Sequence, residues 1–387
     1  MPDVHRSERA PKLLFVVSED WYFHSHRLPL AEAALAEGFD VTVATRVTRH
    51  GDAIRQAGIR VIPIGMRRRS MNVIDELRSI LELRRVVAAQ RPDIIHNVAL
   101  KPVLHGSIAA RLSGRVGVVN AIAGMGYLFT SSAPRARLAR PLVTLALRVL
   151  LDGRANRVIV QNPEDLAFLV ERRMVRRDHI RLIRGSGVDT TKFMRTGESA
   201  GTPVVMLASR MLRDKGIPDF VAAARLLLDE GVAARFVLVG GPDPGNPASI
   251  PEDELRKLVD RAGIEWWGPR SDMPAVIGEA HVMCLPTTYG EGVPKVLLEA
   301  AACGRPIVAT DVQGCREVVR SEVNGLLVPP REPVALAQAI RRLLSEPATR
   351  SRMGEAGRNL VQSEFSIEHV TAATMAIYRE LLGSARS

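Results

Sequence analysis

Short apolar segments alternate with amphipathic segments along the 387-residue chain. The apolar segments predict strands at 12–18, 39–45, 59–65, 93–98, 116–123, 157–162 and 180–185, and then at 203–209, 234–240, 264–268, 281–286, 306–310 and 324–329. Helical periodicity falls between them, at 27–37, 73–90, 102–112, 135–151 and 163–173, and then at 216–230, 251–262, 273–279, 294–302, 314–320 and 333–345. This alternation is typical of parallel sheets covered by helices on both faces. The pattern predicts an α/β protein with two Rossmann-like, doubly wound parallel sheets.

A linker rich in Gly, Ser and Thr separates the two sets of strands at 185–203. It predicts an N-terminal domain over 1–185 and a C-terminal domain over 186–365, and two further helices are expected at 350–358 and 366–382. The apolar content of 46% suits two domains of ordinary size.

Cysteine usage and hydropathy restrict the compartment. Cys284, Cys303 and Cys315 have no disulfide framework spacing, which indicates reduced thiols in the cytoplasm, and no metal site is expected. The first apolar segment is too short for a signal peptide, and no segment of 18 apolar residues is present. We therefore expect a chain that does not cross a membrane.

All of the excess positive charge lies in the first half. Residues 1–185 hold 30 Lys and Arg against 17 Asp and Glu, whereas residues 186–387 hold 23 against 25. Such asymmetry indicates an anionic partner surface, either a membrane leaflet or nucleic acid. No nucleic-acid-binding motif accompanies it, so a nucleic-acid partner is not predicted. In the segment 131–154, arginines and leucines interleave as in an amphipathic interfacial helix, but Leu142, Leu145 and Leu150 would also suit the buried face of a core helix.

The most informative segment is YGEGVPKVLLEAAACG at 289–304, in which Glu291 and Glu299 are eight positions apart. A helix is expected to begin near Pro294 and to end at Gly304. The free N–H groups of such a helix start suit a phosphate, and Gly292 leaves room for it. A phosphate beside two carboxylates that accept from hydroxyl groups indicates a nucleotide sugar. The alternative is that Glu291 only complements the helix dipole and Glu299 is a solvated helix residue.

Arg210 and Lys215 follow another predicted strand, at the edge of the sheet where ligands of doubly wound folds bind. Cations in this position would neutralise a departing diphosphate. The alternative is that Lys215 pairs with Asp214 or Asp219 at a helix start.

The segment 289–304 resembles the E-x7-E region of retaining glycosyltransferases of family 4, which have the GT-B fold with two facing Rossmann-like domains. The resemblance implies that Glu291 contacts the donor sugar, that Glu299 holds the ribose hydroxyls, and that the configuration of the sugar is retained. It also implies that Arg210 and Lys215 bind the donor diphosphate, and that a terminal helix at 366–387 crosses back to the first domain. The remaining donor-binding residues are expected to be Gly292, Val293, Pro294, Lys295 and, in the loop facing the base, Arg270.

The resemblance extends to 93–106 and 120–129, as found in family members that lengthen lipid-linked glycans. It implies that His96 lies near the donor sugar or the acceptor, as a catalytic residue, and that Lys101 pairs with an acceptor phosphate. The alternative is that His96 is an ordinary satisfied polar residue.

The chain departs from the family after its first strand, where many members carry a Gly-Gly loop. Here SEDWYFHSHR occupies 18–27, and we expect this loop to shape the acceptor side through Asp20 and His24. The alternative is that its aromatic residues only pack and that His26 and Arg27 cap the next helix.

The sequence therefore predicts a metal-independent glycosyltransferase without a cofactor, with a UDP-sugar as substrate. The predicted acceptor is a glycan or a polyprenyl-diphosphate-linked glycan, at the cytoplasmic face of an anionic membrane to which the enzyme binds peripherally. Two alternatives stay open, namely a glycosyltransferase with a soluble acceptor and a nucleotide-sugar epimerase.

Overall fold

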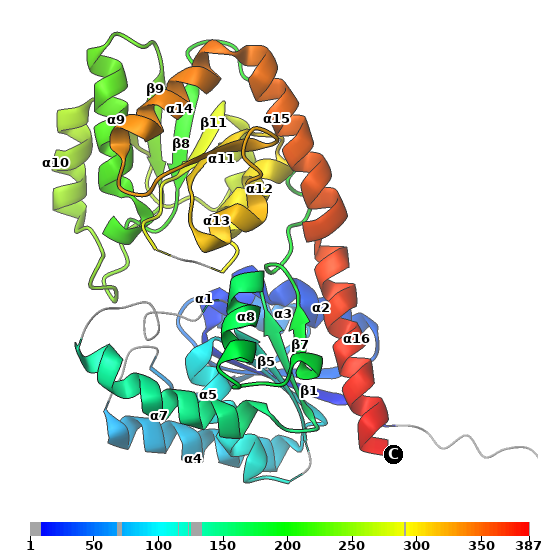
Figure 1. Cartoon of the computed structure of the whole chain (residues 1–387). Coiled ribbons are helices and arrows are strands. Elements are labelled where there is room, and N and C mark those ends of the chain that lie inside the picture. The colour runs from blue at the N-terminus through cyan, green and yellow to red at the C-terminus, as the bar shows by residue number, and fades with distance from the viewer. Residues whose placement is uncertain are drawn as a thin grey trace, which may run out of the picture. The chain divides into compact units, whose positions relative to one another are not determined.

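The computed structural model describes residues 9–67, 72–114, 116–122, 124, 134–289 and 292–386, with side chains omitted for 134–139 and 384–386. The chain forms two compact units (Figure 1). Unit 1 comprises Met1–Ile183 and Val370–Ser387, and unit 2 comprises Arg184–His369. Each unit is built on one parallel sheet, and all of the strand segments predicted from the sequence form strands. The α/β prediction with two doubly wound sheets is therefore confirmed.

Unit 1 contains a seven-stranded sheet in the order β3-β2-β1-β4-β5-β6-β7. Its strands are β1 (Lys12–Glu19), β2 (Asp40–Arg46), β3 (Arg60–Pro63), β4 (Ile94–Val98), β5 (Gly117–Ile122), β6 (Asn156–Val160) and β7 (Ile180–Leu182). Its helices are α1 (Asp20–His26), α2 (Leu28–Ala36), α3 (Gly51–Gln56), α4 (Val73–Gln90), α5 (Leu100–Arg111), α7 (Pro134–Leu151) and α8 (Pro163–Glu171). The last helix, α16 (Ile367–Arg386), begins in unit 2 and continues in unit 1 from Val370.

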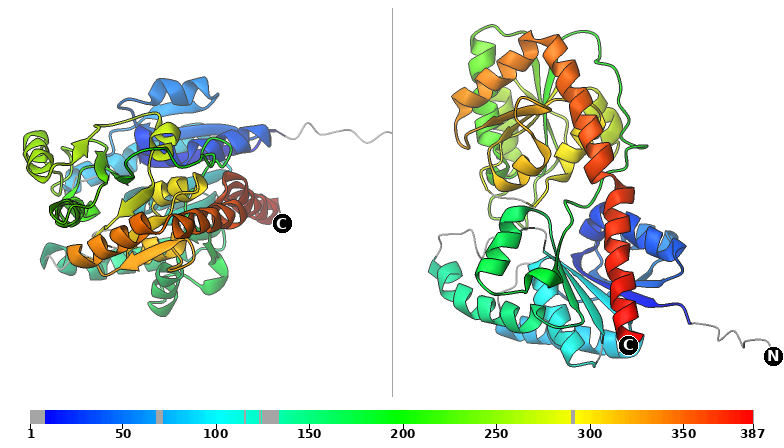
Figure 2. Two further views of the ribbon diagram at one scale, coloured as in Figure 1. Left: turned by 90° about the horizontal axis from the view of Figure 1, so that it is seen from above. Right: turned by 45° about the vertical axis from the view of Figure 1, so that its right-hand side comes forward.

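The two faces of this sheet have separate apolar cores. On one face, Phe15 and Phe23 pack with residues of α16 such as Met375 and Tyr378. On the other face, Leu83 and Val87 of α4 pack with small residues of α5. The views of Figures 1 and 2 accordingly show α16 and α4 on opposite sides of the strands. The strands read as continuous apolar runs because both faces are covered.

Unit 2 contains a six-stranded sheet in the order β10-β9-β8-β11-β12-β13. Its strands are β8 (Val204–Ala208), β9 (Arg235–Val239), β10 (Glu265–Trp266), β11 (Val282–Leu285), β12 (Ile307–Thr310) and β13 (Gly325–Val328). Its helices are α9 (Ile217–Asp229), α10 (Glu252–Ala262), α11 (Met273–Gly278), α12 (Lys295–Ala302), α13 (Gln313–Val318), α14 (Pro333–Ser345) and α15 (Pro347–Leu360), followed by a π-helical turn at Val361–Phe365. Cys284, Cys303 and Cys315 are buried free thiols in its core.

The predicted loop at 18–27 is wrong, because the structure has a helix there. β1 runs directly into α1, and Phe23 on this helix is fully buried against Phe15. The chain bends once, at Arg27, before α2 begins. The segment contains neither Gly nor Pro, so nothing in it interrupts a helix once one aromatic side chain reaches the core.

Candidate functional site

Each sheet has one topological switch point, where chain connections from two neighbouring strands lead in opposite directions. In unit 2 it lies between β8 and β11, and in unit 1 between β1 and β4. Ligands of doubly wound folds bind outside the carboxyl ends of the strands at such points. The loops after β8 and β11 carry the predicted donor-side residues, and the segments after β1 and β4 carry the predicted acceptor-side residues.

The turn that carries Lys215 is fixed against the loop after β11. Thr288 donates its backbone N–H to the Asp214 carbonyl at 2.9 Å, and the Thr287 hydroxyl donates to the same oxygen at 3.0 Å. The following Gly216 has φ +76°, and a Cβ there would lie 1.9 Å from the Pro286 carbonyl oxygen. Only glycine allows this approach at this φ. The two loops therefore meet closely at the switch point.

Lys215 lies beside the segment that leads to the E-x7-E region. Its ammonium nitrogen is 5.7 Å from the centroid of the Tyr289 ring. Glu291, two residues beyond, lies outside the described residues together with Gly290. Its assignment to the donor sugar stays a prediction.

Helix α12 begins close to where the sequence predicted. Pro294 is its N-cap, with φ −65°, and the chain leaves the helix at Gly304 with φ +68°. Gly292 and Val293 form the approach to this helix start. The arrangement keeps the first turn, with Lys295, at the carboxyl edge of β11.

Glu299 lies one turn after Lys295, and its carboxylate oxygen is 3.4 Å from the Lys295 ammonium. Its side chain is only 12% exposed. Burial raises the pKa of Glu299, while the charges of Lys295 and Lys192 oppose the rise. A largely buried carboxylate influenced by two cations is suited to accept hydrogen bonds from ligand hydroxyls.

The other two predicted donor-side cations are already paired. Arg210 follows β8 and donates to Asp243, beyond β9, at 2.5 Å. Arg270 follows the edge strand β10 and donates two hydrogen bonds to Asp272, at 2.8 and 2.5 Å. Arg210 thus stays at the switch point, whereas Arg270 lies two strands away, about 10 Å at ordinary strand spacing.

Asp20 has a structural partner, which corrects its assignment to the acceptor side. Its buried carboxylate accepts from the Thr48 hydroxyl at 2.6 Å and from the backbone N–H groups of Thr48, Arg49 and His50 at 2.7–2.9 Å. Burial alone would raise its pKa, but these hydrogen bonds lower it to about 2. Asp20 therefore anchors the segment between β2 and α3, and the hydrogen bonds that its carboxylate accepts come from groups of the protein.

This anchoring brings a residue to the edge of unit 1 that the sequence did not single out. The ring of His50 lies 4.7 Å from the ring of His24, a predicted acceptor-side residue. His24 is half-buried on α1, so the carboxyl edge of β1 and β2 carries an imidazole pair. No local pattern could have found His50, since its neighbour is 26 residues away in sequence.

His96 is also corrected, because it lies in the core. It is fully buried in β4, stacks on Phe15 at 5.1 Å, and its Nδ1 is 2.5 Å from the Tyr378 hydroxyl. Burial and the nearby charge of Arg27 hold its pKa well below the usual value. A side chain in this position does not reach a substrate. Successive residues of a strand point to opposite faces, and at His96 the side chain points to the α16 face.

Lys101 opens α5 at the carboxyl edge of β4, where it was predicted, but it is bound to groups of the protein. Its ammonium contacts Glu76 of α4 at 2.6 Å and the Arg67 carbonyl at 2.8 Å. Glu76 also contacts His105 at 2.8 Å. An acceptor phosphate would therefore have to share Lys101 with Glu76.

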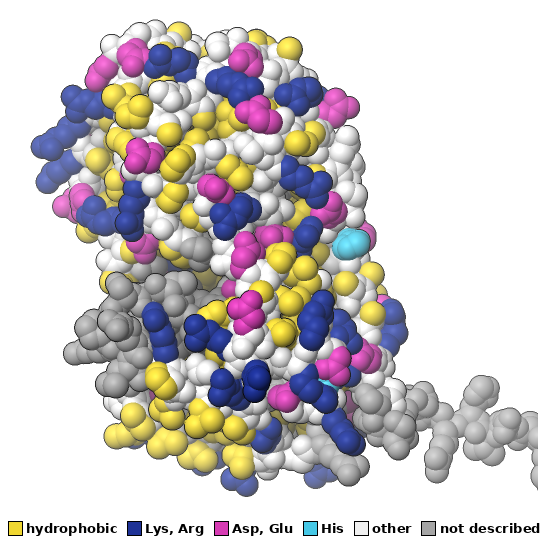
Figure 3. Space-filling view, viewed as in Figure 1, with side chains coloured by type: hydrophobic (Ala, Val, Ile, Leu, Met, Phe, Trp, Pro, Cys, Tyr) yellow, Lys and Arg dark blue, Asp and Glu magenta, His cyan; other side chains and the backbone are white. Residues whose placement is uncertain are grey.

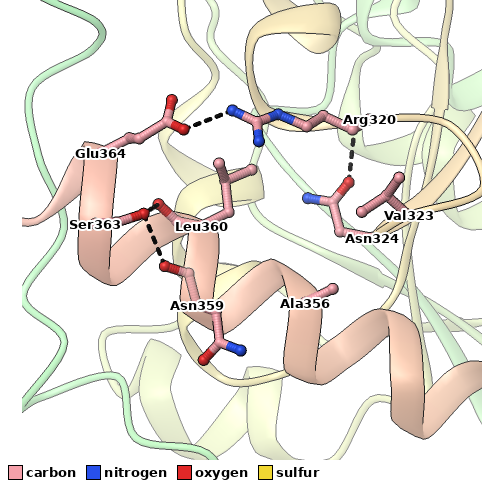
Figure 4. Close-up of a pocket in the computed structure, with 8 residues that line it drawn as sticks. All are labelled: Arg320, Val323, Asn324, Ala356, Asn359, Leu360, Ser363 and Glu364. Atoms are coloured by element: carbon pink, nitrogen blue, oxygen red, sulfur yellow. Dashed lines mark hydrogen bonds and ion pairs between the residues drawn. The ribbon is translucent and has the colours of Figure 1, made fainter.

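A separate pocket in unit 2 contains none of the predicted residues. It is lined by side chains of α15, the π-helical turn and the loop before β13 (Figure 4). Its charged groups satisfy one another, since Glu364 accepts from Arg320 at 2.6 Å and from Arg184 at 2.8 Å. This pocket therefore offers none of the groups on which the donor-site prediction depends.

Comparison with known proteins adds independent findings. Residues 202–346 match the family described as "Glycosyl transferases group 1", and residues 12–162 match the family described as "Glycosyl transferase 4-like". The chain is 25% identical over 342 residues to the N,N'-diacetylbacillosaminyl-diphospho-undecaprenol alpha-1,3-N-acetylgalactosaminyltransferase of Campylobacter jejuni, covering 85% of this chain and 88% of that protein.

Two solved structures share the fold. Sucrose-phosphate synthase from Thermosynechococcus elongatus has a TM-score of 0.81 at 24% identity, covering 97% of this chain and all of that one. HepE from Anabaena, in complex with UDP and glucose, has a TM-score of 0.78 at 18% identity, covering 95% of this chain and 99% of that one. Both similarities extend over the two units.

Proposed function

Because the chain belongs to the group 1, family 4-like glycosyltransferases and has the GT-B fold, we propose that it transfers a sugar from a UDP-sugar to a polyprenyl-diphosphate-linked glycan, with retention of configuration. In this proposal unit 2 binds the donor and unit 1 binds the acceptor. The enzyme acts as a peripheral protein at the inner face of the membrane. No helix of the described residues combines the length and apolar character needed to span a bilayer.

The observation that carries the proposal is the contact between two loops of unit 2. The hydrogen bonds from Thr287 and Thr288 to the Asp214 carbonyl hold the Lys215 turn against the segment that leads to α12. A diphosphate bound there would meet the Lys215 ammonium from one loop and the helix start at Val293 to Lys295 from the other. UDP bound to HepE, which shares the fold, supports this choice of nucleotide.

The proposed chemistry is dissociation of the sugar from its diphosphate. The bond between the anomeric carbon and the diphosphate oxygen breaks, and its electron pair stays on the diphosphate. Lys215, Arg210 and the N–H groups of the helix start stabilise the growing negative charge. The acceptor hydroxyl forms the new bond to the same carbon, and the departing phosphate takes its proton.

The carboxylates position the donor in this scheme. Glu299 accepts hydrogen bonds from the ribose hydroxyls, and Glu291 holds the sugar. Positive groups of the protein supply the field that a divalent ion supplies in other enzymes, so we expect turnover to survive EDTA. No cofactor is needed, since the donor is itself the activated group.

The acceptor class is supported by similarity and by charge. The relative from Campylobacter jejuni is named for an undecaprenyl-diphosphate-linked acceptor and aligns with most of this chain. The excess positive charge lies in residues 1–185. Such charge attracts an anionic membrane surface, where a polyprenyl diphosphate resides.

The test combines binding with turnover. A panel of nucleotide diphosphates and their sugars is screened by thermal shift, since a ligand that binds the folded state raises the melting temperature. Lys215→Ala is expected to lower kcat/KM at least about 100-fold, because it removes a charge that meets the leaving group. The matched control is Lys257→Ala, an exposed lysine of α10. Unchanged turnover in Lys215→Ala or Glu291→Ala would refute the site.

A soluble acceptor is the second candidate, favoured by the similarity to sucrose-phosphate synthase, which is named for a product that is not a lipid. Transfer to short glycans without any lipid carrier would support it. Incubation of the donor without an acceptor tests the epimerase alternative, which requires an isomerised nucleotide sugar as product.

A further inference from the structure

Three helices of unit 1 form a layer over one face of the sheet. α5 lies in the middle and is largely buried, with α4 packed on one side of it and α7 on the other. Leu83 and Val87 of α4 and Leu147 and Leu151 of α7 are buried beneath the layer. The opposite sides of α4 and α7 therefore form the outer surface of this layer.

This outer surface concentrates exposed apolar side chains. Of the fifteen large hydrophobic side chains that are exposed among the described residues, eight belong to α4, to α7 or to the end of α5. They are Val73, Ile74, Leu77, Leu81, Leu112, Leu142, Leu145 and Val149. Figure 3 shows hydrophobic side chains gathered over the position of α4 and α7. We call these eight residues the apolar face.

The apolar face of α4 is a second stripe, distinct from its core stripe. Leu77 is 56% and Leu81 49% exposed, whereas Leu83 is fully buried. Arg84 and Arg85 follow Leu81 by three and four residues, so they lie on its side of the helix, and both are exposed. Among the described residues of unit 1, this stripe of α4 is exposed and not covered by another element.

Two of the three acidic side chains of α4 contact other segments of unit 1, and the third, Asp75, is half-buried in the first turn. Glu76 contacts Lys101 and His105 of α5, and Glu82 accepts a hydrogen bond from the Gly65 backbone at 2.9 Å. Residues 94–151, which include α5 and α7, hold Lys101 and six arginines and no Asp or Glu. The apolar face is consequently bordered by cations.

A pocket on the same layer adds a place for an anion. It lies between the ends of α4 and α5 and is lined by Arg84, Arg91 and Ser113, with Leu112 of the apolar face at its rim. Two guanidinium groups are donors that bind a phosphate group well, whereas the Ser113 hydroxyl already donates to the Ala109 carbonyl at 2.8 Å.

We propose that the apolar face docks unit 1 on an anionic lipid bilayer, with its leucines in the outer part of the acyl layer and the arginines at the level of the headgroups. Residues 73–151, which span the three helices, hold eleven Lys and Arg against four Asp and Glu. Apolar residues bordered by such an excess of cations match the chemistry of an anionic membrane surface. A second copy of the chain is a poorer occupant, because two copies would bring like charges together. The inference rests on the proposed function, in which the enzyme must reach a lipid-linked acceptor held in the bilayer.

The orientation follows from the topology of unit 1. α4 follows β3 and precedes β4. Because these two strands belong to one parallel sheet, α4 begins at the carboxyl edge of the strands. Val73, Ile74 and Leu77 on its first turns lie at that edge, and Glu76 beside them contacts Lys101. The end of the apolar face that carries Val73, Ile74 and Leu77 thus adjoins the predicted acceptor side.

The experiment measures co-flotation of the full chain with vesicles of phosphatidylglycerol and phosphatidylcholine, and with vesicles of phosphatidylcholine alone, in low and high salt. Leu77→Gln/Leu81→Gln and Leu142→Gln/Leu145→Gln each remove half-exposed leucines. The matched control is Leu226→Gln/Val334→Gln, which changes exposed apolar residues of unit 2. A third double variant, Arg84→Gln/Arg85→Gln, removes two arginines beside the apolar face. Its matched control is Arg225→Gln/Arg261→Gln, which removes two arginines of unit 2.

The full chain is expected to float with anionic vesicles and to be released by high salt. Partition should fall about fivefold for each arginine and about tenfold for each inserted leucine that is replaced, with both controls unchanged. Binding that is absent, or equal in the leucine variants and the control, would overturn the proposal. Self-association lost in the leucine variants would also overturn it, in favour of an interface between copies.

The outcome is separable from that of the proposed function, since flotation requires neither donor nor acceptor. If docking is right, the leucine variants keep transfer to a water-soluble acceptor analogue and lose transfer to acceptor embedded in vesicles. Vesicle binding without any sugar transfer would leave the docking face standing and refute the proposed function.

Discussion

Replacing Gly216 by alanine should disconnect the Lys215 turn from the loop after β11. The added Cβ would lie 1.9 Å from the Pro286 carbonyl oxygen, whereas ordinary contacts of a Cβ begin at 3.4 Å. The Pro286 carbonyl belongs to the backbone and cannot rotate away as a side chain can. The turn or the loop must therefore shift by roughly 1.5 Å, because packed interiors leave no slack. A misplacement of about 1 Å costs roughly 100-fold in rate when catalytic groups must be aligned. We therefore expect kcat/KM to fall about 100-fold or more.

Stability must be separated from this effect, since alanine is also strained at φ +76°. Gly231 provides the control at the other end of α9, with φ +78° and no atom within 4 Å of a built Cβ. The conformational cost of about 1–2 kcal/mol is common to both variants. Gly231→Ala should lower the melting temperature by several degrees and leave turnover unchanged.

The assay is UDP release at saturating acceptor, together with melting temperatures by circular dichroism. Gly216→Ala should melt below Gly231→Ala, and it alone should lose turnover. The reasoning is refuted if the two variants have equal kcat/KM after correction for folded protein.

Three further predictions concern the titrating and buried groups. Glu299→Gln should raise the donor KM about tenfold at neutral pH. In the native enzyme we expect KM to rise as pH falls, because burial raises the pKa of Glu299 and its carboxylate protonates sooner than a free glutamate. The variant should lack this rise, and a pH dependence that persists in it would count against this role. Asp20→Asn should lower the free energy of unfolding by about 2 kcal/mol at pH 7, because the pKa of Asp20 is about 2 in the folded protein against an ordinary value of 3.8. The carboxylate therefore stabilises the fold above pH 4. In acid-unfolding curves, the difference in stability between the native protein and the variant should vanish as pH falls towards 2. Tyr378→Phe should lower the free energy of unfolding, measured in urea, by about 1–3 kcal/mol, because His96 Nδ1 loses its buried hydrogen-bond partner. A tenfold loss of activity in the folded variant would instead indicate that His96 has a functional role.

The sequence specified the strands well because each is a local signal. Continuous apolar runs such as those of β1 and β8 are buried on both faces, and their order along the chain predicts a parallel sheet whatever the distant partners are. The start of α12 was found for a similar reason, since Pro294 and Gly304 act on the backbone within one turn. Asp20 and His96 were assigned wrongly because their partners are Thr48 and Tyr378, which no local pattern connects to them.

By itself, the sequence determined the alternation of strands and helices, the family resemblance of the E-x7-E region and the excess of positive charge in the first half. Only the tertiary structure decided which face of each helix meets the core. The alternative that Leu142 and Leu145 belong to a buried face is wrong, since they are 72% and 57% exposed, while Leu150 is buried. α4 likewise has apolar residues on two sides, and hydropathy alone does not distinguish the buried side from the exposed one. Burial depends on which other segments occupy the space beside a helix, and that is settled only when the whole chain has folded.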